Sequence, residues 1–164
     1  MKTIIFFLVC GLIPVILYQS CSQNQKQPES AADILKSARD TVSISGTDIT
    51  LNTYLWRDFM PISPPEGKPL RATISLQPVN SENLPAGIDA TKIYIINDSE
   101  IWSVELKPFG ELAEEAPLKK LERMAENGPK WGPGINVTVV VEIVDEQGKS
   151  YLLRAGEQPI HKTV

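Results

Sequence analysis

Histidine and cysteine are scarce in this chain, which has one histidine and two cysteines among 164 residues. Ser/His/Asp and Cys/His catalysis both need a histidine base that a third group holds in place. His161 lies close to the C-terminal residue and has no acidic residue beside it in the sequence. No glycine-rich phosphate loop and no metal-ligand spacing of Cys or His occurs. We therefore predict no catalytic residue, no cofactor and no metal site, so the protein is not expected to be an enzyme.

Two alternatives stay open against that prediction. The 20 acidic residues leave room for an enzyme that uses an unrecognised pair of carboxylates. A soft copper site would need Met and His ligands, and Met60, Met124 and His161 are the candidates for a metal carrier.

A concentrated basic surface is also lacking. The chain has 16 basic and 20 acidic residues, for a net charge of −4, and its densest basic stretch, Lys119–Arg123, is interleaved with an acid. Nucleic-acid binding usually requires Lys and Arg gathered on one face. The sequence therefore predicts no nucleic-acid partner.

The N-terminus begins with one positive charge at Lys2, followed by an apolar run from Ile4 to Tyr18. This run is shorter than the about 20 apolar residues that a membrane-spanning helix needs, but it suits a secretory signal. Gln19-Ser20-Cys21 follows, and the sequence turns polar directly after it. The arrangement resembles a bacterial lipoprotein signal. The resemblance implies cleavage after Ser20 and acylation of Cys21, whereas ordinary cleavage near Ser20 would instead release a free secreted domain.

The resemblance also implies a location and a partner. Residues 1–20 are the expected signal peptide, residues 21–40 a lipidated tether, and residues 41–164 the folded domain. The lipid bilayer is the expected partner through acylated Cys21. Ser22 follows the cysteine where a retention signal would have Asp, so we expect an exported protein with the outer membrane favoured. After cleavage one cysteine remains, so no disulfide within the chain is expected.

Alternation of apolar and polar residues dominates the rest of the chain from Thr41 onward. The strongest run is Ile135–Val144, and the Asn97-Asp98-Ser99 triplet supplies turn chemistry between two further runs. In contrast, Pro117–Glu126 shows apolar residues at helical spacing, with Gly128 as a candidate cap. We therefore expect an all-β fold, an antiparallel sandwich of seven to eight strands with one short helix in a long connection.

With this number of expected strands, segment 41–164 resembles the immunoglobulin-like or fibronectin-like domains of bacterial surfaces. The chain also resembles small uncharacterised bacterial lipoproteins with segments such as Trp56–Pro61 and Gly128–Gly134. That resemblance implies no established activity.

Two loops rich in Pro and Gly carry the candidate binding residues, in segments 56–67 and 128–134. Prolines restrict backbone angles, so both loops are expected to be pre-ordered. Rigid aromatic residues with a charged rim are typical of binding surfaces. The predicted contacts are Trp56, Arg57, Asp58, Lys130 and Trp131.

A purely structural role for the same residues stays open. Trp131 would then close one end of the sandwich, and Arg57 and Asp58 would form a local ion pair that ties the loop down. Under the binding interpretation, the expected role is non-catalytic binding of an envelope protein or glycan, or an accessory role in the cell envelope.

Overall fold

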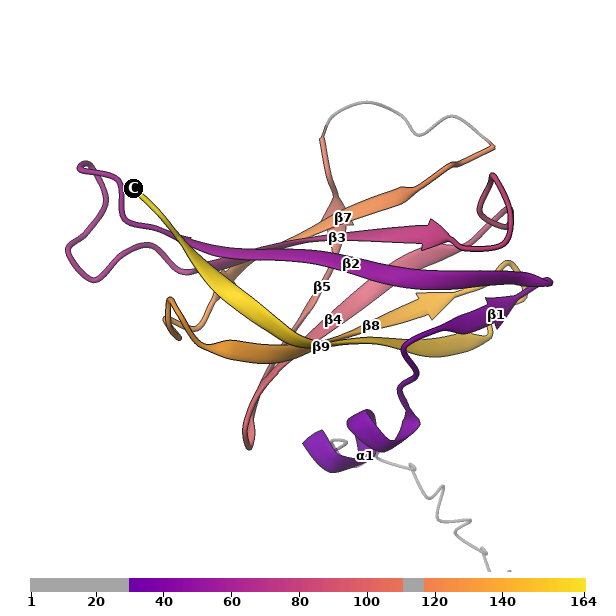
Figure 1. Cartoon of the computed structure of the whole chain (residues 1–164), viewed down its shortest axis with the longest axis horizontal. Coiled ribbons are helices and arrows are strands. Elements are labelled where there is room, and N and C mark those ends of the chain that lie inside the picture. Colours follow the sequence, from indigo (N-terminus) through magenta and orange to yellow (C-terminus); the bar gives the residue numbers. More distant parts are fainter. Residues whose placement is uncertain (1–29, 111–116) are drawn as a thin grey trace, which may run out of the picture.

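A computed structural model describes residues 30–110 and 117–164. Figure 1 shows a body of strands with one short helix beside it. The elements are α1 (Ala31–Ser37), β1 (Val42–Ile44), β2 (Thr47–Asp58), β3 (Leu70–Pro78), β4 (Asp89–Asn97), β5 (Glu100–Glu105), β6 (Lys107–Pro108), β7 (Leu121–Gly128), β8 (Asn136–Val144) and β9 (Ser150–Thr163). The predicted all-β class is therefore confirmed. The signal peptide and Cys21 lie outside the described residues.

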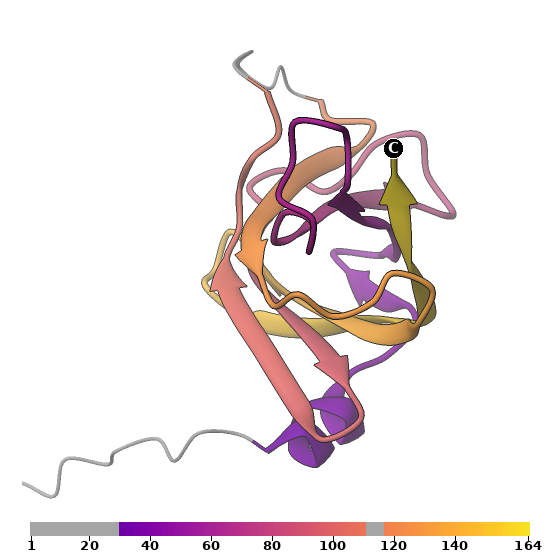
Figure 2. The same cartoon turned by 90° about the vertical axis from the view of Figure 1, so that its left-hand side faces the viewer.

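The strands form two layers that share strand β9. The order is β5-β4-β8-β9-β2-β3-β7-β6, and β1 pairs with β2 beside this path. The first part of β9 pairs antiparallel with β8, from Val144↔Ser150 to Asn136↔Pro159. Its last four residues pair in parallel with β2, from Leu55↔Ile160 to Asp58↔Thr163. Because β9 crosses from one layer to the other, the sheet curls into the nearly closed shape visible in Figure 2.

The parallel pair corrects one expectation, since the sheet is mixed rather than purely antiparallel. Residues 150–163 form the single long strand β9. The predicted hairpin is confirmed, because β4 and β5 pair from Lys92↔Glu105 to Asn97↔Glu100 around a two-residue turn. Asp98 has φ 52° there, a left-handed conformation that Asp tolerates better than most residues.

The core lies between the two layers and follows the alternation of the sequence. Along β8 the inward residues Val137, Val139, Val141 and Ile143 are all buried. Inward residues of β2 and β3 meet them, including Leu55 and Ile74. Burial of these aliphatic side chains is the main stabilising contribution to such a fold.

The helix predicted over 117–126 is wrong, because Leu121–Gly128 is strand β7. It pairs antiparallel with β3 from Leu76↔Leu121 to Leu70↔Gly128. Every second residue of β7 points inward and is buried, as expected for a strand: Leu121, Arg123 and Ala125. Because Arg123 is charged, the sequence does not show an apolar residue at each inward position of this strand. The Arg123 guanidinium pairs with Asp89 on the opposite layer at 2.8 Å.

Gly128 is likewise not a helix cap. A Cβ atom at this position would lie 2.9 Å from Leu70 Cβ and 3.0 Å from the Trp102 ring. The close approach lets Trp102 of β5 pack over β7, where the two layers meet. Trp102 is therefore a packing residue at this point of the fold.

Helix α1 packs on the outer face of the layer formed by β4, β8 and β9. Ser30 caps its first turn by accepting a hydrogen bond from the Asp33 N–H at 3.2 Å. Ile34 and Ala38 are buried against Ile96 and Val140. The last part of the expected tether is therefore packed on the body. No helix in residues 30–110 and 117–164 has the length and apolar composition needed to cross a bilayer.

Candidate functional site

Arg57 joins the two loops that the sequence analysis singled out. It ends the inward row of β2 and is only 3% exposed. Its Nε donates to the Lys68 carbonyl at 3.0 Å, and its Nη2 donates to the Glu66 carbonyl. Its Nη1 donates to the carbonyls of Lys130 at 3.0 Å and Gly132 at 2.7 Å. One buried side chain thus holds residues 59–69 and 129–135 together, and we call this pair of loops the loop platform.

The C-terminal end of β9 lies beside the loop platform, at the left of Figure 1. There the Phe59 N–H donates to the Thr163 carbonyl at 2.8 Å. Two cations lie over the Phe59 ring, with Arg57 Cζ 5.0 Å and Lys162 Nζ 5.2 Å from the ring centroid. This ring also covers Gly67, where a Cβ atom would come within 2.5 Å of it. Sequence reasoning did not identify Phe59, although its place between Asp58 and a Pro-rich loop marks it as an anchor.

Two ion pairs tie the platform on its outer side. Asp58 pairs with Lys68 at 2.8 Å and accepts the Met60 N–H at 2.8 Å. Glu66 pairs with Lys130 at 2.9 Å, which links one loop to the other. Hydrogen bonds from Lys68 and Lys130 hold the pKa of Asp58 and of Glu66, respectively, below the ordinary value. The Arg57–Asp58 ion pair that the structural alternative contained does not form, since the two side chains point to opposite sides of β2 and have different partners.

The two predicted tryptophans have different surroundings. Trp56 is half-buried on the outward side of β2, where its ring stacks on Tyr54 with centroids 5.4 Å apart. Tyr54 also stacks on His161 at 4.9 Å. Trp131 packs against the main core. This packing of Trp131 agrees with the alternative in which it closes one end of the body.

The exposed apolar surface of the platform comes from residues that the sequence analysis did not select. Met60 is 47% exposed and Ile62 is 89% exposed. Pro61, Pro64 and Pro65 surround them and restrict the backbone. Met60 and Ile62 therefore give this loop apolar side chains that are in contact with water.

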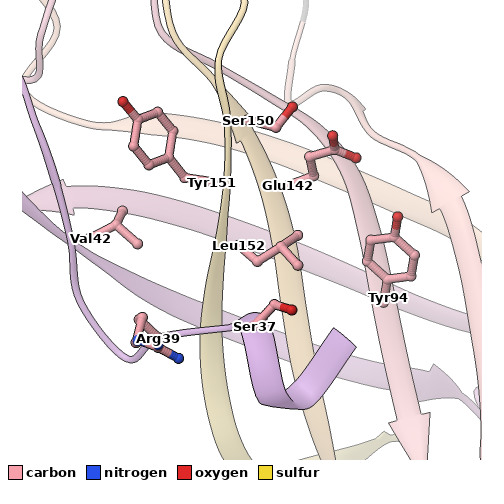
Figure 3. Close-up of a pocket in the computed structure, with 8 residues that line it drawn as sticks. All are labelled: Ser37, Arg39, Val42, Tyr94, Glu142, Ser150, Tyr151 and Leu152. Atoms are coloured by element: carbon pink, nitrogen blue, oxygen red, sulfur yellow. The ribbon is translucent and has the colours of Figure 1, made fainter. Parts of the chain in front are cut away.

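A second region lies beside α1, where a hollow of about 400 Å³ opens on the outer side of β4, β8 and β9. Figure 3 shows its walls, with Tyr94, Glu142 and Leu152 from the strands and Ser37 and Arg39 from the end of α1 and the segment after it. Val42, Ser150 and Tyr151 complete the lining. The Tyr151 hydroxyl donates to Asp145 at 3.0 Å.

The residues named for the copper alternative lie on different elements. Met60 is in the loop platform, Met124 is half-buried in β7, and His161 is in β9. Across the described ranges, no three side chains among His, Cys, Asp and Glu come together in a way that could hold a metal ion. The carboxylates of Glu66 and Asp58 each have a lysine partner, so the loop platform offers no free carboxylate pair from these two residues.

Comparisons of the sequence with protein-family models and with curated proteins find no match.

Proposed function

We propose that this chain is an exported lipoprotein, anchored by acylated Cys21, with a non-catalytic binding role in the bacterial cell envelope. The N-terminal sequence supports the anchor, because a charged start, a short apolar run and a cysteine precede a polar segment. A mature lipoprotein carrying more than one acyl chain stays stably attached, whereas a single chain binds only marginally. Ser22 after the cysteine supports an outer-membrane address.

The observation that carries the binding role is the fastening of two loops by Arg57. A binding loop loses conformational entropy when a partner immobilises it, and pre-ordering reduces that loss. Here the buried guanidinium, the Phe59 ring and the Glu66–Lys130 pair order the platform before any partner arrives. Exposed Met60 and Ile62 then supply apolar contacts, with Lys130 on the charged rim.

Two measurements test the two halves of this proposal. Mass analysis of the native N-terminus should find a chain that begins at acylated Cys21. An unprocessed chain that begins at Met1 without fatty acid would overturn the anchor.

Crosslinking in intact cells tests the binding role. A photocrosslinker placed at Ile62 should capture a specific envelope component, and Met60→Ser should reduce the yield without changing the melting temperature. The matched control is a crosslinker at Val79, which is 62% exposed in the turn after β3. Equal capture from both positions would show that the platform has no special role.

We further propose that the body is an immunoglobulin-like sandwich rather than a closed barrel. Support comes from the two layers β5-β4-β8 and β2-β3-β7, with β5 and β6 as the two ends of the strand order. In a sandwich, the outer backbone amides of β5 lack strand partners and should exchange with solvent faster than those of β4. Equal protection of β5 and β4 amides in hydrogen exchange would favour a barrel.

A further inference from the structure

The hollow beside α1 contains two charges that have no counter-charge within the described parts of the chain. Glu142 is half-buried, and its carboxylate makes no hydrogen bond or ion pair with any described residue. Lys92, its register neighbour on β4, packs instead over the Tyr94 ring at 4.9 Å. A carboxylate that has no cation among its described neighbours is a suitable partner for the cationic group of a ligand, which would form a hydrogen bond between charged groups.

Arg39 supplies the opposite charge on the other side of the hollow. Its Nη1 donates to the carbonyls of Lys36 at 3.1 Å and Ala38 at 3.3 Å, which positions the guanidinium. No carboxylate among the described residues pairs with it, because neighbouring Asp40 pairs with Arg154 at 2.8 Å. The remaining N–H groups of Arg39 are therefore available for an anion, and guanidinium geometry suits a carboxylate or a phosphate.

The backbone places these two charges on either side of Leu152. The Arg39 N–H donates to the Leu152 carbonyl at 3.0 Å, and Leu152 is the register partner of Glu142 on β8. Two strand spacings separate the Arg39 and Glu142 backbones, which is about 10 Å. Half-buried Leu152 and Tyr94 lie in the same hollow, so apolar surface accompanies the charges (Figure 3).

We propose that this hollow binds a small zwitterion, with its ammonium group at Glu142 and its carboxylate or phosphate group at Arg39. The apolar part of the ligand would contact Leu152 and Tyr94. Amino acids and short peptides have this chemistry, and so does the phosphoethanolamine headgroup of a lipid. The site is separate from the loop platform and does not require acylation of Cys21.

NMR titration of the full chain in detergent tests the proposal with matched probes. L-phenylalanine carries both charges, phenethylamine lacks the carboxylate, and 3-phenylpropionate lacks the ammonium group. The zwitterion should shift the amide signals of Arg39, Glu142 and Leu152 at millimolar concentration, and each single-charge probe should bind at least about tenfold more weakly. O-phosphoethanolamine forms a second arm. Shifts with it alone would indicate a lipid headgroup, and shifts with phenylalanine alone would indicate an amino acid or peptide.

Variants locate the site and complete the test. Glu142→Gln and Arg39→Gln should each weaken binding at least about tenfold, because each removes a hydrogen bond between charged groups. Glu100→Gln and Lys119→Gln remove exposed charges elsewhere and should change nothing. No shift with either zwitterion, or equal binding of phenethylamine and phenylalanine, would overturn the proposal. So would unchanged binding to a folded Glu142→Gln variant.

Discussion

The loop platform and the hollow beside α1 each contain an arginine, but the two arginines are used differently. Arg57 is buried, and its nitrogens donate to four carbonyls from both loops of the platform. Arg39 is exposed and uses one nitrogen on two carbonyls of its own segment. A guanidinium whose donors are satisfied internally stabilises structure, whereas one with free donors can bind a ligand. The comparison separates a region in which the arginine fastens two loops from a region in which the arginine has no carboxylate partner among the described residues.

Replacing the two arginines tests this difference most directly, and it should give the largest effect. Arg57→Ala leaves four carbonyls without their donor and opens a gap at the end of the body. We expect it to lower the free energy of unfolding by about 3–5 kcal/mol. Arg39→Ala should cost within about 1 kcal/mol, since its contacts are local and exposed. Urea denaturation of both variants measures the difference. Similar losses in the free energy of unfolding would show that the two arginines do not have different structural roles.

Gly67→Ala tests the packing of Phe59 on the platform and should give a smaller loss. Gly67 has φ +76°, and a new Cβ would lie 2.5 Å from the Phe59 ring. We expect a loss of about 1–3 kcal/mol from the strained backbone and the displaced ring.

Gly46→Ala is the matched control, because Gly46 has φ +81° and open space around the new Cβ. Gly46→Ala should lower the free energy of unfolding only through its strained backbone, by about 1 kcal/mol. If thermal unfolding shows equal losses for the two variants, Phe59 does not restrain the platform.

Acid should weaken the platform through its ion pairs. Lys68 and Lys130 lower the pKa of Asp58 and Glu66, so both carboxylates are more acidic in the folded chain than in the unfolded chain. Their stabilisation is fully present above the ordinary carboxyl range and is lost as pH falls through the lowered values. The melting temperature should therefore change little between about pH 7 and 5 and fall below about pH 4.

A double variant isolates the contribution of these two groups. Asp58→Asn with Glu66→Gln should start less stable at neutral pH and should lose less on acidification. The pKa values of Asp40 and Asp145 are also lowered, by Arg154 and by backbone N–H groups respectively, so part of the acid sensitivity should remain. Identical pH profiles for the double variant and the native chain would contradict this account.

Glu142→Gln should give the smallest effect on stability, although the proposed ligand site depends on it. Glu142 has no partner to lose among the described residues, so the free energy of unfolding should stay within about 0.5 kcal/mol of the native value. Urea denaturation without ligand checks this expectation. A large loss would show that Glu142 is structural, and would remove the contrast between the two regions.

Much of the fold could be predicted from local pattern, because alternation reports burial directly. Val137, Val139, Val141 and Ile143 lie in the core where period two places them. The prediction for segment 121–128 was a helix, and it was wrong because the charged Arg123 occupies an inward position of a strand. Its ion pair with Asp89 forms only when the two layers pack together. No local pattern contains that partner, which is 34 residues away in the sequence.

The candidate site could be predicted only in part. The sequence selected both loops and Arg57 as a binding contact, and under the structural alternative it paired Arg57 with Asp58, its nearest neighbour. The real partners are the carbonyls of Glu66, Lys68, Lys130 and Gly132. Every residue has a backbone carbonyl, so the sequence does not indicate which carbonyls accept these hydrogen bonds. The hollow was missed entirely, since Arg39 and Glu142 come to line the same hollow only when β9 pairs with both of their segments.

The sequence by itself determined the β class, the main strands and the stiffness of the two loops, because these follow from local alternation and restricted backbone angles. Tertiary structure alone decided that β9 joins two layers, that one arginine ties both loops, and that one hollow holds two charges without an ion-pair partner in residues 30–110 and 117–164. Those features depend on contacts between distant segments, where the partner of each polar group is chosen by the folded arrangement.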